Sequence, residues 1–223
     1  MSPDSAELEV IYSRRFASNR EYRRQVWEIL VGDFFGPMIP ANGAVLDLGC
    51  GYGEFINIVP AQTKYGMDLN ATTGKLLAPD VRFLRQDCST TWPLEENSLD
   101  VVFTSNFFEH LPDKSTLGAT LEQARRCLKP GGKLIAMGPN IKYLPGEYWD
   151  FWDHYLPLTE VSLSEGLMTR GFDIVECFGK FLPYTMDRQR RYPLFTLKMY
   201  LKLKPAWGVF GKQFLVVAAK RRG

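Results

Sequence analysis

The distribution of apolar residues along the chain predicts strands that alternate with helices. Nearly continuous apolar runs are typical of strands buried on both faces, and they occupy residues 44–48, 81–84, 99–105 and 133–138, with a weaker run at 63–68. Apolar residues at helical spacing are found at residues 5–36, 53–60, 72–79 and 115–129. Two later apolar runs, at residues 171–181 and 212–221, predict two more strands.

Alternation of this kind is typical of a parallel sheet that carries helices on both faces. In such sheets a ligand binds beyond the carboxyl ends of the strands, near the point where the strand order reverses. We therefore expect the functional residues directly after the predicted strands.

The first predicted strand runs into VLDLGCGYGEF, where Gly49, Gly51 and Gly53 alternate with larger residues. A glycine turn between a strand and a helix usually holds a pyrophosphate through free backbone N–H groups. The fingerprint of dinucleotide sites is G-x-G-x-x-G, but this chain has Glu54 at the position of the third glycine. A carboxylate there disfavours a pyrophosphate and suits a ligand with a cationic amino-acid end.

The segment DLGCGYGEF resembles the first motif of class I S-adenosylmethionine-dependent methyltransferases of the small-molecule, ubiquinone-biosynthesis-like type. Later motifs of that family resemble YGMDLN, RQDCS, LDVVFTSNFFEHL and LKPGGKLIAMGPN, so the resemblance covers about residues 42–140 and the last predicted strand. It implies S-adenosyl-L-methionine as the cofactor. The implied cofactor-binding residues are Asp47, Gly49, Gly51, Asp68, Leu69, Asp87, Cys88 and Asn106.

Within this set the resemblance implies that Asp68 binds the ribose hydroxyls and Asp87 the adenine amino group, with Cys88 beside the ring. Asn106 is expected near the methionine part, and Asp47 near its ammonium group. A carboxylate that only caps the loop is the alternative for Asp47.

The resemblance also implies the fold, an α/β, Rossmann-like, doubly wound seven-stranded methyltransferase sheet that is mostly parallel with an antiparallel last strand, plus N-terminal helices. Residues 1–40 are expected to form a helical lid, and residues 41–223 the methyltransferase domain with insertions at about 139–158 and 180–211, effectively one domain. Side chains of the lid that would reach inward are Tyr12, Arg14, Arg15, Tyr22 and Arg23.

The acceptor side is expected in residues 143–155, which contain six aromatic residues. Aromatic faces pack well on flat ligands and sugar rings. In this segment His154 is the leading candidate for a general base, with Asp153 as its orienting partner. The alternative is that His154 caps the helix that begins near Thr159.

His110, in NFFEHL, is the second catalytic candidate, and a packing role at a helix start is its alternative. In methyltransferases of ubiquinone biosynthesis, acids and a histidine at this place can hold magnesium. Here Asn106 stands where an acid is wanted. We therefore expect no metal.

The net charge of +2 conceals an uneven distribution, because no acidic residue follows Asp187 while residues 188–223 contain ten Lys and Arg. Within this basic end, one apolar helical face lies near three lysines; the face consists of Leu194, Leu197, Tyr200 and Leu201, and the lysines are Lys198, Lys202 and Lys204. Such a pattern suits peripheral contact with an anionic membrane through residues 188–212. A helix packed on the domain with its lysines in solvent is the alternative.

The remaining composition narrows the class of protein. The four cysteines form no CxxC pair, the first residues lack the pattern of a signal peptide, and no apolar run is long enough to span a bilayer. We expect a cytoplasmic enzyme, with peripheral membrane contact, that methylates a small or sugar- or lipid-linked acceptor at oxygen. The alternatives are an RNA or protein methyltransferase, which TSNFFEHL in place of an NPPY-type motif disfavours, and a non-catalytic cofactor-binding relative; nucleic acid is not an expected partner.

Overall fold

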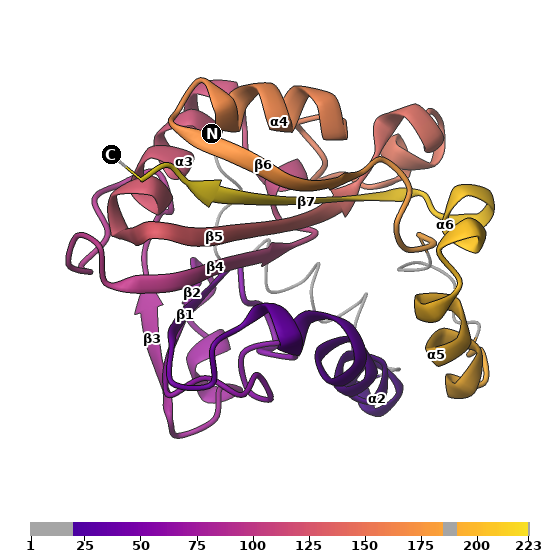
Figure 1. Cartoon of the computed structure of the whole chain (residues 1–223), viewed down its shortest axis with the longest axis horizontal. Helices are drawn as coiled ribbons and strands as arrows, with labels where there is room; N and C mark the ends of the chain where they lie inside the picture. The colour runs from indigo at the N-terminus through magenta and orange to yellow at the C-terminus, as the bar shows by residue number, and fades with distance from the viewer. Residues whose placement is uncertain (1–19, 185–190, 223) are drawn as a thin grey trace.

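The computed structural model describes residues 20–184 and 191–222, in which seven strands form one sheet (Figure 1). The strand order is β3-β2-β1-β4-β5-β7-β6, and β7 runs antiparallel to both of its neighbours while the other pairs are parallel. The strands are β1 (Ala44–Leu48), β2 (Thr63–Asp68), β3 (Val81–Arg85), β4 (Leu99–Ser105), β5 (Leu128–Pro139), β6 (Phe172–Phe178) and β7 (Gln213–Lys220). The predicted fold class, including the antiparallel last strand, is confirmed.

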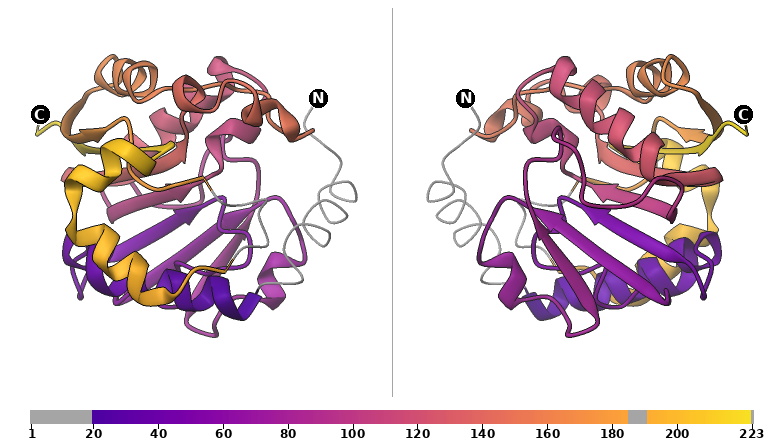
Figure 2. Two further views of the ribbon diagram at one scale, coloured as in Figure 1. Left: turned by 90° about the vertical axis from the view of Figure 1, so that its right-hand side faces the viewer. Right: turned by 90° about the vertical axis from the view of Figure 1, so that its left-hand side faces the viewer.

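Helices cover both faces of the sheet, as the alternating pattern predicts (Figures 1 and 2). On one face α3 (Lys114–Cys127) and α4 (Glu160–Met168) pack on an apolar core that includes Leu121 and Leu167. On the other face a second core joins α2 (Arg20–Leu30) with α5 (Leu194–Lys202) and α6 (Lys204–Phe210). The sheet is therefore buried on both sides, which explains the continuous apolar runs of its strands.

The helix predicted at residues 5–36 is present in its described part. It comprises α2, a π-helical turn (Val31–Phe35) and a short 3₁₀ turn (Gly36–Met38) that contains Pro37. Tyr12, Arg14 and Arg15 of the predicted lid lie outside the described residues.

Two predicted helices are wrong. Residues 53–60 form turns closed by isolated bonds such as Asn57 N–H to Gly53 O, and residues 72–79 contain only a 3₁₀ turn (Thr73–Lys75). The Asn57 side chain ties the two segments together, since it donates to Leu76 O and accepts from Ala78 N–H. This tertiary contact satisfies backbone groups that a regular helix would pair internally.

The helix predicted at residues 115–129 ends at Cys127, because β5 begins directly after it. Leu128 pairs with Leu99 and Lys133 with Val101, so residues 129–132 bulge out of the strand. Gly131, with a φ of 80°, provides the left-handed backbone of this bulge.

Candidate active site

The glycine loop after β1 owes its shape to three alternate glycines with positive φ angles. These are 72° at Gly49, 48° at Gly51 and 73° at Gly53, in a region that other residues rarely adopt. A Cβ atom on Gly49 would lie 2.3 Å from the ring of Phe107, in the segment after β4. The loop therefore packs against the segment that follows β4. From β1 the strand order runs to β2 and β3 on one side and to β4 and β5 on the other, and the loop lies at this switch point.

Three carboxyl groups surround this loop. The Asp68 carboxylate, at the end of β2, accepts hydrogen bonds from Gly51 N–H at 2.9 Å and Asn70 N–H at 2.8 Å. Asp47, in β1, is almost fully buried. Glu54 forms an ion pair of 2.7 Å with Arg23 of α2. Arg23 is the one arginine predicted to reach inward from the lid that lies within the described residues, and it contacts the glycine loop.

Burial raises the pKa of all three carboxyl groups. For Asp47 the pKa is raised well above its usual range, first by burial and then by the negative charges of Asp68 and Glu54. Burial also raises the pKa of Asp68, although backbone N–H groups and His110 lower it in part. The pKa of Glu54 is likewise raised by burial and lowered in part by Arg23. A cationic ligand would relieve this crowding of acids, whereas a pyrophosphate would add to it.

Asn106 lies beside the glycine loop, directly after β4. Its φ of 49° is unusual for a residue with a side chain, and its Nδ2 donates to Ser105 Oγ at 3.1 Å. Its buried Oδ1 has no hydrogen-bond partner among the described residues. A buried acceptor of this kind suits a ligand N–H group. The acid cluster and the Asn106 Oδ1 thus fit S-adenosylmethionine, whose amino-acid end carries an ammonium group.

The other predicted cofactor residues lie beyond β2 and β3. Leu69 is exposed directly after Asp68. Asp87 Oδ1 accepts bonds from the N–H and hydroxyl of Ser89, which fixes the turn after β3. Cys88 is buried in the apolar core, and its sulfur accepts a hydrogen bond from Thr120 Oγ1 at 3.2 Å. Burial raises the pKa of the Cys88 thiol to about 11, so the group stays protonated.

The three predicted catalytic residues lie together. His110 Nδ1 is 2.8 Å from the backbone oxygen of Asp153 and 3.3 Å from its Oδ2. The ring of His154 meets that of His110 edge to face, with centroids 5.1 Å apart. The side chain of His110 is 23% exposed, whereas His154 is buried. Of the two histidines, His110 is therefore the more accessible, and it also lies close enough to Asp68 to lower the pKa of that acid.

His154 does not cap the following helix. The N-cap of α4 is Thr159, whose hydroxyl accepts from Ser162 N–H while Ser162 Oγ accepts from Thr159 N–H. His154 instead stacks on Phe151 and packs against Tyr148, at centroid distances of 4.7 Å in both cases. The alternative of a helix cap is wrong.

The aromatic segment divides into an inner and an outer set. Tyr148 is fully buried and donates from its hydroxyl to Leu156 O at 2.6 Å, whereas Trp149 and Trp152 are exposed. Glu109 O accepts from the N–H groups of Tyr155 and Leu156, which fastens this segment to the turn after β4. The inner aromatics thus hold His154, and the outer ones face solvent.

Glu109, which the sequence offered beside His110 as a possible metal ligand, has an environment that the sequence did not indicate. Its side chain is buried, and burial raises the pKa of its carboxyl to about 8, helped by Asp153. One potential ligand atom each of Glu109, His110 and His154 lie within 4.8 Å of one another. His154 is 44 residues away from His110 in the chain, so sequence spacing could not bring these groups together.

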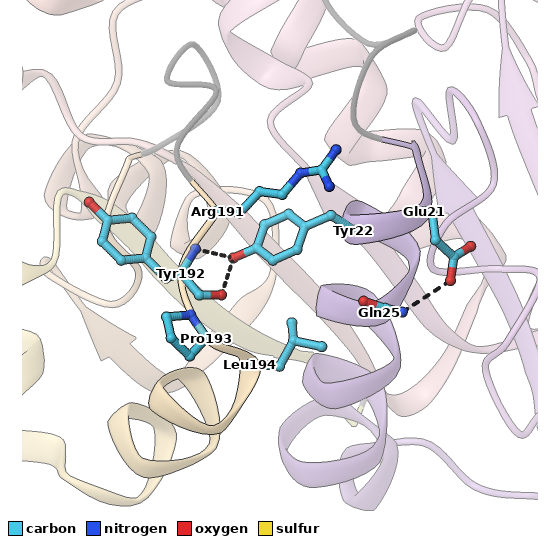
Figure 3. A pocket seen from close by; sticks show the side chains of 7 residues that line it. All are labelled: Glu21, Tyr22, Gln25, Arg191, Tyr192, Pro193 and Leu194. Atoms are coloured by element: carbon cyan, nitrogen blue, oxygen red, sulfur yellow. Dashed lines mark hydrogen bonds between the residues drawn. The ribbon is translucent and has the colours of Figure 1, made fainter.

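A pocket of about 490 Å³ opens between α2 and the segment that leads into α5 (Figure 3). The Tyr22 hydroxyl donates to Tyr192 O and accepts from Tyr192 N–H, both at 3.0 Å. Other lining residues are Glu21, Gln25, Arg191, Pro193 and Leu194. Since Arg23 of the same helix contacts Glu54, the pocket lies on the other side of α2 from the glycine loop.

Comparison with known proteins finds domains that resemble this one. Residues 46–136, less than half of the chain, match the family model of a methyltransferase domain. A complex of the Haloferax volcanii Trm112 methyltransferase activator with its putative methyltransferase contains a similar fold, at 16% identity, a TM-score of 0.71 and 98% coverage of both chains. A SAM-dependent methyltransferase from Archaeoglobus fulgidus is 19% identical with a TM-score of 0.69, covering 96% of this chain and 99% of that one.

One curated relative, an uncharacterized 37.1 kDa protein in transposon TN4556 of Streptomyces fradiae, is 27% identical over 117 residues. The match covers 48% of this chain and spans a third of that protein's length.

Residues 46–136 thus match a methyltransferase domain, and the strand order agrees with the fold of the similar S-adenosylmethionine-dependent methyltransferase structures. The methyltransferase-domain match and the similar structures support the predicted cofactor, S-adenosylmethionine. The ubiquinone-biosynthesis-like subtype and the individual roles of the site residues stay predictions. Within residues 20–184 and 191–222, no helix has the length and apolar content to cross a membrane.

Proposed function

We propose that the protein transfers a methyl group from S-adenosylmethionine to an oxygen atom of a small, sugar-linked or lipid-linked acceptor. The observation that supports this proposal is the position of His110, which contacts Asp153 on the acceptor side and is near enough to Asp68, beside the glycine loop, to lower the pKa of that acid in part. A proton acceptor thus lies between the cofactor residues and the aromatic segment.

The cofactor, when bound, supplies a methyl group that is already activated for displacement. Asp47 and Asn106 would hold its amino-acid end, Asp68 and Leu69 its ribose, and Asp87 with Cys88 its adenine. Gly49 and Gly51 would let the backbone approach it. These assignments follow the resemblance stated for the sequence.

His110 is the group that we assign as the general base. The backbone oxygen of Asp153 can only accept a hydrogen bond, so the short contact of 2.8 Å places the hydrogen on His110 Nδ1. In the neutral ring, Nε2 is then the proton-accepting atom. Asp153 thereby orients His110, and His154, packed behind it, fixes the position of the His110 ring. This exchanges the roles of the two histidines relative to the expectation from the sequence.

The test requires the acceptor, which a mass-shift screen of metabolite and glycan pools with labelled cofactor would identify. On that acceptor, His110→Gln should reduce kcat about 10²–10⁴-fold, the usual range for general acid–base catalysis. Affinity for S-adenosylmethionine should remain near that of the wild type, because His110 serves the acceptor. His154→Gln is the matched control and should reduce kcat far less.

Two results would contradict the proposal. A large loss of turnover in His154→Gln, with His110→Gln nearly active, would restore His154 as the base. A protein that binds the cofactor tightly but methylates nothing in any pool would be a non-catalytic relative.

A further inference from the structure

Helix α5 has two apolar faces. The face predicted from the sequence is the one that packs on the domain: Leu194, Leu197 and Tyr200 lie against the core, and Leu201 is buried in it. The Tyr200 hydroxyl donates to Phe181 O at 2.6 Å, and Trp207 of α6 donates to Tyr200 O at 2.9 Å. These contacts of the inner face attach α5 and α6 to the rest of the domain, and the opposite side of the two helices takes no part in them.

The outer side of these helices is also apolar. Phe195, Met199 and Leu203 follow one another at intervals of four residues, which places Phe195 and Met199 in one row along α5, with Leu203 at its C-cap. Val209 and Phe210 add exposed apolar side chains at the end of α6, and these five side chains are between 51% and 70% exposed. We call these five residues the α5–α6 face; both helices lie at one edge of the molecule (Figures 1 and 2).

Lysines run beside this apolar row. Lys198 and Lys202 are each three residues after a member of the row, so they line one flank of it. Both are exposed, and neither forms an ion pair with an acidic residue in the described part of the chain. Because the chain has no acidic residue after Asp187, α5 and α6 themselves carry only positive formal charge, whereas the neighbouring α2 contributes Glu21 and Glu28.

We propose that the α5–α6 face docks on the surface of an anionic lipid bilayer, with Phe195, Met199 and Leu203 inserted among the acyl chains and Lys198 and Lys202 at the headgroup phosphates. Apolar side chains flanked by lysines are the arrangement of helices that lie in a membrane interface. The buried centre of a protein–protein interface, in contrast, is depleted of lysine. Positive charge therefore favours a bilayer over a second copy of the chain.

The α5–α6 face begins next to the pocket beside α2. Residues 191–194, at the start of α5, line that pocket, and Tyr192 is bonded to Tyr22. Docking through α5 would thus bring the pocket close to the membrane surface. Neither the docking nor this consequence depends on the proposed function.

The experiment is co-sedimentation of the full chain with vesicles of phosphatidylcholine, with and without phosphatidylserine. The wild type should bind the vesicles that contain phosphatidylserine and be released by salt, since exposed charges are screened. Phe195→Gln combined with Met199→Gln should weaken binding at least about tenfold, because two apolar side chains no longer leave water. Lys198→Glu combined with Lys202→Glu should abolish the preference for phosphatidylserine.

Matched controls are Met168→Gln, at an exposed apolar position of α4, and Lys114→Glu at the start of α3, which should bind vesicles like the wild type. Affinity of every variant for S-adenosylmethionine should be unchanged, which shows that it is folded and separates this proposal from the methyltransferase assignment. Equal binding to both kinds of vesicle, or wild-type binding by the Phe195 and Met199 double variant, would overturn the proposal. So would a dimer in solution that these substitutions dissociate.

Discussion

Among single residues, Asp68 offers the most direct test of the cofactor site. Its carboxylate already holds Gly51 and Asn70 of the loop, and it is the residue expected to pair with the ribose hydroxyls. Leaving buried polar groups unpaired costs about 1–3 kcal/mol, so Asp68→Ala should weaken S-adenosylmethionine binding roughly tenfold or more, measured by calorimetry. Asp173→Ala, at an exposed position of β6, is the control. Unchanged affinity would remove Asp68 from the site, and tight NADH binding by the wild type would overturn the choice of cofactor.

The residues around His110 raise the question of a metal ion. Glu109, His110 and His154 offer three donor atoms, but Asn106 supplies an amide where the methyltransferases of ubiquinone biosynthesis, which the motif resembles, have an acid, and His110 Nδ1 is engaged by Asp153. We expect turnover to survive treatment with EDTA. Loss of turnover that added magnesium or zinc restores would show that Glu109, His110 and His154 bind a metal.

Helix α4 shows how a single element positions the acceptor side. Its capping box, formed by Thr159 and Ser162, fixes the point at which the chain leaves the aromatic segment and becomes helical. Thr159→Ala should lower the free energy of unfolding by about 0.5–2 kcal/mol, measured by urea denaturation. Thr169→Ala, at the other end of α4, should have a smaller effect, since its hydroxyl donates to Gly166 O and accepts from Arg170 in an exposed turn and does not bond to the free N–H groups of the first turn. Equal effects of the two substitutions would show that the cap does not limit the stability of the helix.

The stability of the whole molecule should depend on pH through Glu109. In the folded state its carboxyl keeps a proton up to a pKa of about 8, whereas in the unfolded chain it titrates near its ordinary value of 4.5. Between these values the folded state holds more protons, so the contribution of Glu109 to stability falls as the pH rises from about 4.5 to about 8. Glu109→Gln removes this dependence.

The measurement is urea denaturation of the wild type and Glu109→Gln across that pH range. The difference in unfolding free energy between the two should shift in favour of the variant as the pH rises. Parallel pH profiles would show that Glu109 is charged in the folded protein at neutral pH.

The sequence by itself determined the sheet. The apolar runs placed β1, β2 and β4 at their observed bounds, because strands buried on both faces are mostly apolar; β2, with Thr63 and Lys64, gave the weaker run. It also located the glycine loop and Asp68, since a backbone with positive φ angles requires glycine at those positions and family motifs follow the strand ends.

Only the tertiary structure decided which groups meet. The predicted helices at 53–60 and 72–79 gave way to turns because the Asn57 amide bonds across to another segment. The pairing of His110 with Asp153, the burial of Glu109 and the second apolar face of α5 depend on contacts between residues far apart in the chain. Local spacing specifies the period of an element and its ends, but burial and pKa values depend on what the rest of the molecule packs against each side chain.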